Sequence, residues 1–421
     1  WSSDVCSSDL YEKNQHMKIA ITCPASLPAT QFGGIMFLCI HIAKKLSNDG
    51  HNLTIYTTDL DFANNTSTFN KKLPKQEKIG NFFIKRTHVW FSSFLFFINP
   101  GMYKQMMNDD IDIIHAMGVR SFQAFISAIV SRRKNIPLVI SDQGGLTTHP
   151  DLKEASFKKK FLIKLQKPLL KFIINQSTKV IVANHYEKKI FLNFCNESKI
   201  SIVKNGIDLN ELKSSSVNFR QKYNFKEEFI LFLGRFHYVK GVDTLLEAIH
   251  MIKSNSVLNE LKIVIMGVDF GYESKMLQMI DDFGLEKKIV VIKKPPREDV
   301  ISAYNQCKFL VLPSRWELSP LTPLEGFACK KTVISTTAHG IPYTITSDEN
   351  CLMVPPSNPQ KLEESIIELL NNPTKCQSLA ESGFNMVTRE ANLNSMSDRM
   401  FQIYKEIIRL KNNKSNEDSY E

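Results

Sequence analysis

The sequence predicts an α/β protein with two doubly wound domains, each a parallel sheet covered by helices. Short apolar runs typical of buried strands alternate with amphipathic segments along most of the chain, and this order of elements builds parallel sheets. The 421 residues are too many for one ordinary core. A polar stretch at 213–228 interrupts the alternation, and we expect a domain boundary near residue 200.

Composition narrows the class of protein. Hydrophobic residues make up 43% and charged residues 23%, as in soluble globular proteins. The eight cysteines form no C-x-x-C pair, so we expect neither a disulfide framework nor a zinc site, and a reducing, cytoplasmic setting fits. No apolar run reaches the length that a membrane-spanning helix requires. We also expect no nucleic-acid partner.

The first sixteen residues do not belong to the alternating pattern. They are polar and lack the basic and apolar regions of a signal peptide. We interpret residues 1–16 as a remnant of cloning or sequence assembly, with Met17 as the natural start. The first domain is therefore expected over 17–200.

The first domain opens with a strand, MKIAITC, a loop containing Gly33 and Gly34, a helix over 35–47 and a second strand, HNLTIYTT. A polar excursion at 59–80 and a strand at 81–90 follow. The next segment, 91–106, is rich in phenylalanine, and its apolar part is about half as long as a membrane span. A wall of an acceptor pocket, a membrane-surface contact and plain core are all open; core is favoured.

Two later strands of this domain end in polar residues. IDIIHAMG carries His115, and PLVISDQGG carries Asp142, Gln143 and Gly144. A hydrogen-bonded histidine at a strand end is the structural interpretation of His115.

The segment 157–176 has six lysines and no acidic residue. Four of the lysines recur at helical spacing on one side, and the leucines, isoleucines and phenylalanines fall on the other. The pattern fits a surface helix that touches anionic lipid. It also fits an ordinary amphipathic helix packed on the sheet, which we favour because Pro168 interrupts a long interfacial helix.

In the second domain, a strand at 229–233 runs into Gly234-Arg235, and a short loop ends in Lys240-Gly241 before an amphipathic helix. Glycines let the backbone approach a ligand closely, and two cations at a helix N-terminus suit a diphosphate: arginine offers a planar fork and lysine a point charge. A turn glycine with two surface cations is the plain alternative.

Two carboxylates, Glu317 and Glu325, lie eight positions apart between two strand-like runs. The sequence between them predicts a helix start, with Thr322 as N-cap, Pro323 at the first helical position and Glu325 closing a capping box. A solvated loop charge and a capping residue would be the simple interpretation of the pair. The upstream cations favour a ligand site instead.

Together these stretches resemble glycosyltransferase family 4, the retaining, nucleotide-sugar-dependent enzymes of the GT-B fold. The family's G-R-x-x-x-x-K-G loop is matched by Gly234-Arg235 and Lys240-Gly241, and its E-x7-E motif by Glu317 and Glu325. Residues 205–208, Asn-Gly-Ile-Asp, match the N-G-[IV]-D signature at the interdomain connection. The resemblance covers about residues 17–410.

The resemblance implies two Rossmann-like domains that face a deep interdomain cleft. The first, over 17–200, would lie on the acceptor side; the second, over 201–395, would bind the nucleotide sugar; and a crossover helix with a disordered tail would occupy 396–421. It implies that Glu325 binds the ribose hydroxyls, Glu317 the donor sugar, and Arg235 and Lys240 the diphosphate. The implied catalytic residues are Glu317, Lys240, Arg235 and His115. The implied donor-binding residues are Gly33, Gly34, Gly234, Arg235, Lys240, Leu321, Thr322 and Glu325.

The implied activity is transfer, with retention, of a hexose-type sugar from a UDP- or GDP-sugar to a saccharide or lipid-linked acceptor in surface polysaccharide or glycolipid assembly. No metal or other cofactor is expected, because the cations carry the phosphate charge. The first domain departs from the family pattern at Met117 and Gln143, where relatives have histidines. These departures leave its catalytic contacts open. The resemblance still implies that His115, Asp142, Gln143 and Gly144 are candidates to line the sugar or acceptor end of the cleft.

Two alternatives remain. A related GT-B nucleotide-sugar epimerase would share the cleft and need no acceptor. An inactive, membrane-peripheral module that binds sugar nucleotides would use the basic helix at 157–176. A dinucleotide dehydrogenase is not favoured, since no G-x-G-x-x-G follows a strand. Basic charge and the aromatic run favour a cytoplasmic protein at the inner membrane face.

Overall fold

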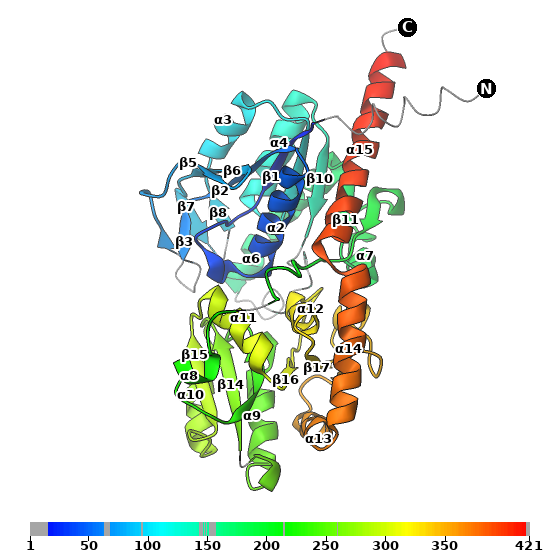
Figure 1. Ribbon diagram of the computed structural model, residues 1–421. Coiled ribbons are helices and arrows are strands. Elements are labelled where there is room, and N and C mark those ends of the chain that lie inside the picture. The colour runs from blue at the N-terminus through cyan, green and yellow to red at the C-terminus, as the bar shows by residue number, and fades with distance from the viewer. Residues whose placement is uncertain are drawn as a thin grey trace, which may run out of the picture.

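The computed structural model describes residues 16–62, 68–93, 96–142, 146, 148, 150, 157–213, 215–258 and 260–417, with no side chains described at 157–165, 257 and 414–417. Two α/β domains are stacked one above the other, and a long C-terminal helix runs beside the first (Figure 1). Each domain has a mainly parallel sheet between two helix layers, as the alternating sequence pattern predicts.

The first sheet has the strand order β12-β11-β10-β9-β1-β2-β6-β5, and of these strands only β5 runs antiparallel to its neighbour. Non-consecutive neighbours such as β1 and β9 are the crossovers of a doubly wound sheet. Its strands are β1 (Lys18–Thr22), β2 (Asn52–Thr58), β5 (Gln76–Ile79), β6 (Phe82–Thr87), β9 (Ile113–Met117), β10 (Leu138–Ser141), β11 (Lys179–Val182) and β12 (Ile200–Ile202). Two small hairpins sit beside it: β3 (Leu60–Phe62) with β4 (Thr68–Phe69), and β7 (Phe91–Ser93) with β8 (Phe96–Ile98).

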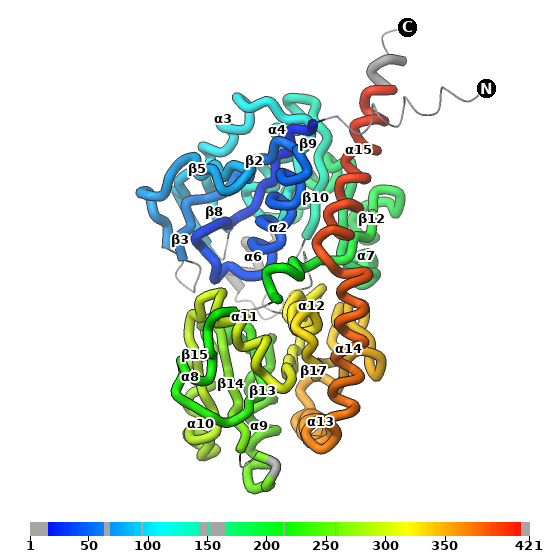
Figure 2. The backbone as a smooth tube through the Cα atoms, viewed as in Figure 1, coloured from blue at the N-terminus to red at the C-terminus, as the bar shows by residue number. Residues whose placement is uncertain are grey.

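Helices cover both faces of this sheet. On one face α2 (Gly34–Asn48) and α15 (Leu393–Glu417) pack over one hydrophobic cluster, and Figure 2 shows them side by side in front of the sheet. On the other face α3 (Gly101–Asn108), α4 (Phe122–Lys134), α6 (Phe157–Gln176) and α7 (His185–Phe191) pack over a second cluster. The apolar faces of these helices are buried because both sides of a parallel sheet need cover.

The second sheet has the order β15-β14-β13-β16-β17-β18. Its strands are β13 (Glu228–Leu233), β14 (Leu261–Gly267), β15 (Ile289–Lys293), β16 (Phe309–Val311), β17 (Thr332–Thr336) and β18 (Leu352–Val354). The helices around it are α8 (Phe219–Lys222), α9 (Val242–Met251), α10 (Glu273–Asp282), α11 (Arg297–Gln306), α12 (Leu321–Ala328), α13 (Pro359–Asn371) and α14 (Pro373–Glu390). β13 and β16 are direct neighbours, so the loops after them open on the same edge of the sheet.

The chain crosses between the domains twice. The first crossing passes Gly206, where a Cβ atom would lie 2.3 Å from the carbonyl oxygen of Asn392. Close approach of these two chain segments therefore requires the glycine, and it does not adopt the positive φ of a turn glycine. At the second crossing α14 leads into α15, which returns to the first domain as the resemblance implies (Figure 1).

Some expected boundaries shift. The first sheet extends through β12, past the boundary expected at 200, and α15 begins before 396. The expected disorder of the C-terminal tail is wrong through Glu417, because α15 continues to that residue. Among the described residues, no helix combines the length and the hydrophobicity needed to cross a bilayer.

Candidate functional site

The loop after β13 is built around two glycines. Gly241 has φ of +68°, and a Cβ atom there would lie 2.0 Å from the carbonyl oxygen of Pro313. Only glycine therefore allows this loop to pack against the loop after β16. Gly234 packs on the aliphatic stem of Lys240, since its Cβ position is 3.7 Å from Lys240 Cδ. The two sequence motifs meet because β13 and β16 are neighbours.

Lys240 and Glu317 form an ion pair at this meeting point. Their side chains are 19% and 16% exposed, so the pair is largely withdrawn from water and still reachable. The Ser314 hydroxyl also donates to Glu317 Oε1 at 3.2 Å. These three residues line a small cavity with Thr322. Lys240, Glu317 and Thr322, three of the residues predicted from the sequence, are thus brought together.

Arg315 holds the loop after β13 in place. Its guanidinium donates to both carboxylate oxygens of Asp243 at 2.7 and 3.0 Å, and to the carbonyl oxygen of Tyr238 at 2.8 Å. Burial alone raises the pKa of Asp243, but the hydrogen bonds from Arg315 and Tyr272 outweigh it and hold the pKa below its usual range. Sequence reasoning missed Arg315, although it lies only two positions before the first glutamate of the E-x7-E motif.

Arg235, the other predicted cation, lies apart from the ion pair. Its guanidinium sits over the ring of Phe270, 4.9 Å from the centroid, which is a cation–π arrangement. The phosphate contact that the resemblance implies for Arg235 stays a prediction.

Glu325 does not close a capping box. α12 begins at Leu321 with Pro320 as N-cap, and no side chain caps it. The Glu325 carboxylate instead accepts from Arg297 Nη2 at 2.7 Å and from the Tyr304 hydroxyl at 2.7 Å. The expected roles of Thr322 as N-cap and of Pro323 as first helical residue are therefore wrong, because α12 already begins at Leu321.

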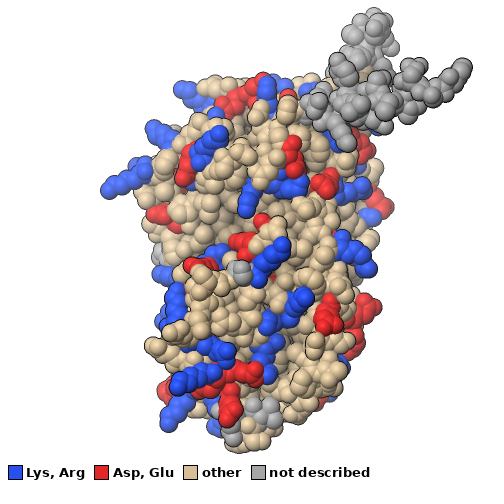
Figure 3. Space-filling model, in the orientation of Figure 1, with Lys and Arg blue, Asp and Glu red and all other residues tan. Residues whose placement is uncertain are grey.

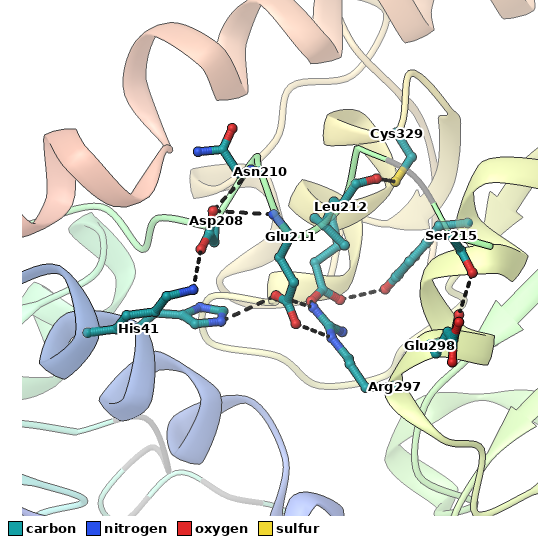
Figure 4. A network of polar contacts seen from close by, with 12 residues as sticks. His41, Asp208, Asn210, Glu211, Leu212, Ser215, Arg297, Glu298 and Cys329 are labelled. Atoms are coloured by element: carbon teal, nitrogen blue, oxygen red, sulfur yellow. Dashed lines mark hydrogen bonds and ion pairs between the residues drawn. The ribbon is translucent and has the colours of Figure 1, made fainter. Parts of the chain in front are cut away.

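Arg297 also ties Glu325 to the interdomain connection. Its Nε and Nη2 bind the two oxygens of Glu211 at 3.0 and 3.1 Å (Figure 4). On the other side, His41 Nε2 of α2 lies 3.3 Å from Glu211 Oε2. A few residues earlier, Asp208 Oδ2 lies 3.8 Å from Lys44 Nζ, also of α2. Polar contacts thus run from the first domain through the linker to Glu325.

The glycine pair of the first domain faces the second domain. Gly33 has φ of +102° and precedes α2, and a Cβ on Gly34 would lie 3.1 Å from Leu321 Cδ1 of α12. The predicted donor-binding residues Gly34 and Leu321 therefore meet across the domains. Nearby, Asn184 Nδ2 donates to the carbonyl oxygen of Leu318 at 2.8 Å.

His115 lies in the core, which corrects its assignment as a catalytic residue. It occupies the middle of β9, is 0% exposed, and faces α15. Its Nδ1 is 2.6 Å from the Tyr404 hydroxyl and its Nε2 2.9 Å from Ser141 Oγ, so both ring nitrogens have partners. Burial lowers the pKa of His115 to about 3 and keeps it neutral. The structural alternative is correct.

The acceptor-side candidates are described only in part. Asp142 is buried, and its Oδ2 accepts from the backbone N–H of Leu146 at 2.8 Å. Gln143 and Gly144 lie outside the described residues. Sequence reasoning missed Glu187 of α7, which is 2% exposed and accepts from Ala183 N–H at 2.6 Å. Burial raises the pKa of Glu187 to about 8, so this carboxyl is mainly protonated at neutral pH.

A metal site was not expected. In the described ranges, no three or more histidine, cysteine, aspartate or glutamate side chains come together in a way that could hold a metal ion.

Comparison with known proteins gives related sequences. An uncharacterised glycosyltransferase of Methanocaldococcus jannaschii is 28% identical over 276 residues, 66% of this chain and 70% of its own length. The UDP-Gal:α-D-GlcNAc-diphosphoundecaprenol α-1,3-galactosyltransferase of Escherichia coli is 22% identical over 305 residues, 68% of this chain and 75% of its own length.

The fold is shared with solved glycosyltransferase structures. The Anabaena protein HepE, solved in complex with UDP and glucose, superimposes with a TM-score of 0.72 and 17% sequence identity, and the match covers 93% of this chain and 100% of that one. At this identity the likeness shows the fold alone, which is GT-B.

Family profiles cover both domains. Residues 32–211 match Glycosyltransferase Family 4, and residues 216–386 match Glycosyl transferases group 1. The two matches meet between β12 and α8, where the chain passes from the first sheet to the second. The chain belongs to the group 1, family 4 glycosyltransferases.

Proposed function

We propose that this protein transfers a hexose-type sugar, with retention and without a metal, from a UDP- or GDP-sugar to a saccharide or lipid-linked acceptor. The observation that carries the proposal is the Lys240–Glu317 ion pair, which lines a small cavity beyond the carboxyl ends of β13 and β16. Its environment provides a cation for a phosphate and a carboxylate for sugar hydroxyls. The Escherichia coli relative acts on a diphosphoundecaprenol-linked sugar, which supports a lipid-linked acceptor here.

Lys240 and Arg235 act on the leaving group. Negative charge grows on the diphosphate as the glycosidic bond breaks, and fixed cations in a partly dry site are worth most at that moment. Lys240, next to the N-terminus of α9, and Arg235 supply that charge, and the proposal therefore needs no metal.

The ion pair also keeps both charges compensated when no donor is bound. Without a donor, Lys240 and Glu317 compensate each other, so neither charge is left unpaired in a site that is mostly closed to water. When a donor enters, phosphate oxygens can share Lys240 and sugar hydroxyls can donate to Glu317. Lys240 and Glu317 therefore each have a polar partner both before and after the donor binds.

The acceptor side of the proposal involves a membrane surface. Trp90 and Phe91 are 75% and 61% exposed at the β7–β8 hairpin, so the expectation of plain core for the phenylalanine-rich segment holds for Phe97 and is wrong for Phe91. Strand pairing puts Phe96 on the hairpin face of Phe91. Partly exposed aromatic rings continue from there across α4 to α6, with centroids 6.0–6.2 Å apart: Phe96, Phe122, Phe125 and Phe172.

The helices beside this aromatic stripe, Phe91 to Phe172, carry basic residues only. α3, α4 and α6 contain no aspartate or glutamate. Their exposed cations with described side chains are Lys104, Arg132, Arg133, Lys167 and Lys171. By contrast, the face with α2 and α15 carries both signs intermixed (Figure 3). Aromatic rings with cations and without acids suit an anionic bilayer surface, where each lysine or arginine contributes about 1 kcal/mol.

Vesicle co-sedimentation tests the membrane contact. The wild type should bind vesicles that contain phosphatidylglycerol and not neutral phosphatidylcholine vesicles. The variants W90S/F91S and K167E/K171E should lose that binding, and Met251→Ser, which removes an exposed side chain of the second domain, should keep it. Equal binding by all variants, or none by the wild type, contradicts the contact.

The transferase activity is tested in two steps. A thermal-shift screen with UDP, GDP and ADP, with and without EDTA, should show one nucleotide that raises the midpoint regardless of EDTA. Radiolabelled sugar from the matching donor should then enter a solvent-extractable lipid-linked product. Donor conversion without any acceptor would favour the epimerase, and nucleotide binding without conversion would favour the inactive module.

A further inference from the structure

Arg297, the first residue of α11, contacts three parts of the molecule at once. It binds the linker through Glu211 and the proposed ribose site through Glu325. Its guanidinium also lies over the ring of Phe37 of α2, 5.1 Å from the centroid. The first domain, the linker and the second domain therefore converge on one side chain. Figure 4 shows its contact with Glu211.

These contacts fix the charge states of the cluster. Burial disfavours the charged form of Arg297, but the nearby carboxylates of Glu325 and Glu211 outweigh it and raise its pKa. Burial likewise raises the pKa of Glu211, but hydrogen bonds from His41 and Arg297 outweigh it and lower the pKa to about 2. One guanidinium thus binds two carboxylates, and the position of each carboxylate depends on the other through Arg297.

We infer that Arg297 is a positioning residue that makes recognition of the donor's ribose depend on the docking of the first domain. The inference rests on the proposed function, together with the contact to the donor's ribose that the resemblance implies for Glu325. Arg297 would not touch the donor. It would set the direction of the Glu325 carboxylate, and Glu211 and Phe37 would set the position of Arg297.

The geometry at Glu325 supports this role. A carboxylate has about four lone-pair sites, two on each oxygen. Arg297 takes one on Oε1 and the Tyr304 hydroxyl takes one on Oε2. One site then remains on each oxygen, which matches the two hydroxyls of a ribose. Without Arg297 the carboxylate loses one of its two anchors, and its free lone pairs no longer have a fixed direction.

Discrimination between ribose and 2′-deoxyribose measures this positioning. In a site built to hydrogen-bond a hydroxyl, its loss leaves a buried acceptor unpaired, at a cost of about 1–3 kcal/mol, or about 5- to 150-fold in affinity. The wild type should therefore bind UDP or GDP in preference to the 2′-deoxy form of the same diphosphate. The ratio of the two dissociation constants is insensitive to a general loss of folded protein.

Four variants and a control separate the contacts. Arg297→Ala should reduce the ratio to below about threefold, and Arg297→Lys should not restore it, because an ammonium cannot bind both carboxylates through a planar fork. Glu211→Gln and Phe37→Ala, which alter neighbours of Arg297 in the linker and the first domain, should reduce the ratio partly. Arg389→Ala removes an exposed arginine that also binds a glutamate, Glu390, and should leave the ratio unchanged.

Each outcome decides a different point. If Arg297→Ala keeps the wild-type ratio, the positioning role is overturned. If only Glu211→Gln and Phe37→Ala keep it, the coupling to the linker and the first domain is overturned. A wild type that binds no nucleoside diphosphate overturns the proposed function and this inference together. If Arg297→Ala does not fold, then Arg297→Lys, Glu211→Gln and Phe37→Ala carry the test.

Discussion

Replacing Lys240 by methionine should affect stability and turnover in separable ways. The substitution keeps much of the aliphatic stem that packs on Gly234 and removes the ammonium group. The carboxylate of Glu317, whose side chain is 16% exposed, then keeps only Ser314 as a described hydrogen-bond partner. Breaking a fully buried pair costs about 3–5 kcal/mol. Partial exposure reduces this to about 1–2 kcal/mol.

The double variant K240M/E317Q isolates that cost. With both charges removed, no unpaired carboxylate remains, so most of the stability should return. In a domain of roughly 200 residues, each kcal/mol moves the Tm by about 2–4 °C. Lys361→Met, at an exposed pair with Glu364, is the matched control and should change the free energy of unfolding by less than about 0.5 kcal/mol.

Turnover should not return with stability. Loss of one fixed charge contact to the leaving group lowers kcat by about 10²- to 10³-fold. We therefore expect release of nucleoside diphosphate by K240M to fall at least 100-fold when compared per folded molecule, and K240M/E317Q to remain as slow. A stable K240M variant with kcat within threefold of the wild type would refute the proposed contact between Lys240 and the leaving diphosphate.

Three further predictions test other parts of the structure. Burial raises the pKa of Glu187 to about 8 in the folded protein, so ionisation of this carboxyl lowers the free energy of unfolding as pH rises from about 4.5 to 8. Across that window Glu187→Gln should gain stability relative to the wild type, at about 1.4 kcal/mol per unit of pKa shift. A pH-independent difference in urea unfolding would contradict this. His115→Gln should lower the Tm through lost core hydrogen bonds yet keep kcat within about threefold, whereas a large fall in kcat with an unchanged Tm would return His115 to the mechanism. Gly241→Ala should cost more stability than Gly284→Ala, since both have positive φ but only Gly241 faces a carbonyl oxygen; equal calorimetric Tm values would argue against the close approach.

The sequence predicted those features that depend on neighbouring strands. Lys240 and Glu317 follow the adjacent strands β13 and β16, so the order of elements and the position of each motif at a strand end were enough to bring them together. The helix after Lys240-Gly241 was also predictable, because its apolar residues recur at helical spacing.

Features set by distant partners were not predictable in this way. Local spacing gave Glu325 a capping role, but Arg297 and Tyr304, which hold it, come from α11. His115 resembled a strand-end ligand, yet its partner Tyr404 comes from the helix that returns at the end of the chain. A single sequence carries no signal for a pairing across 289 positions.

The most direct test of the account is calorimetric titration of UDP and of GDP into the full chain in EDTA, with Glu325→Ala and K240M measured alongside. The account predicts that one nucleoside diphosphate binds at a single site without metal, and that both variants weaken it by at least about tenfold. If neither nucleotide binds the wild type, or if one binds equally well to all three proteins, the site built around Lys240, Glu317 and Glu325 is not the donor site.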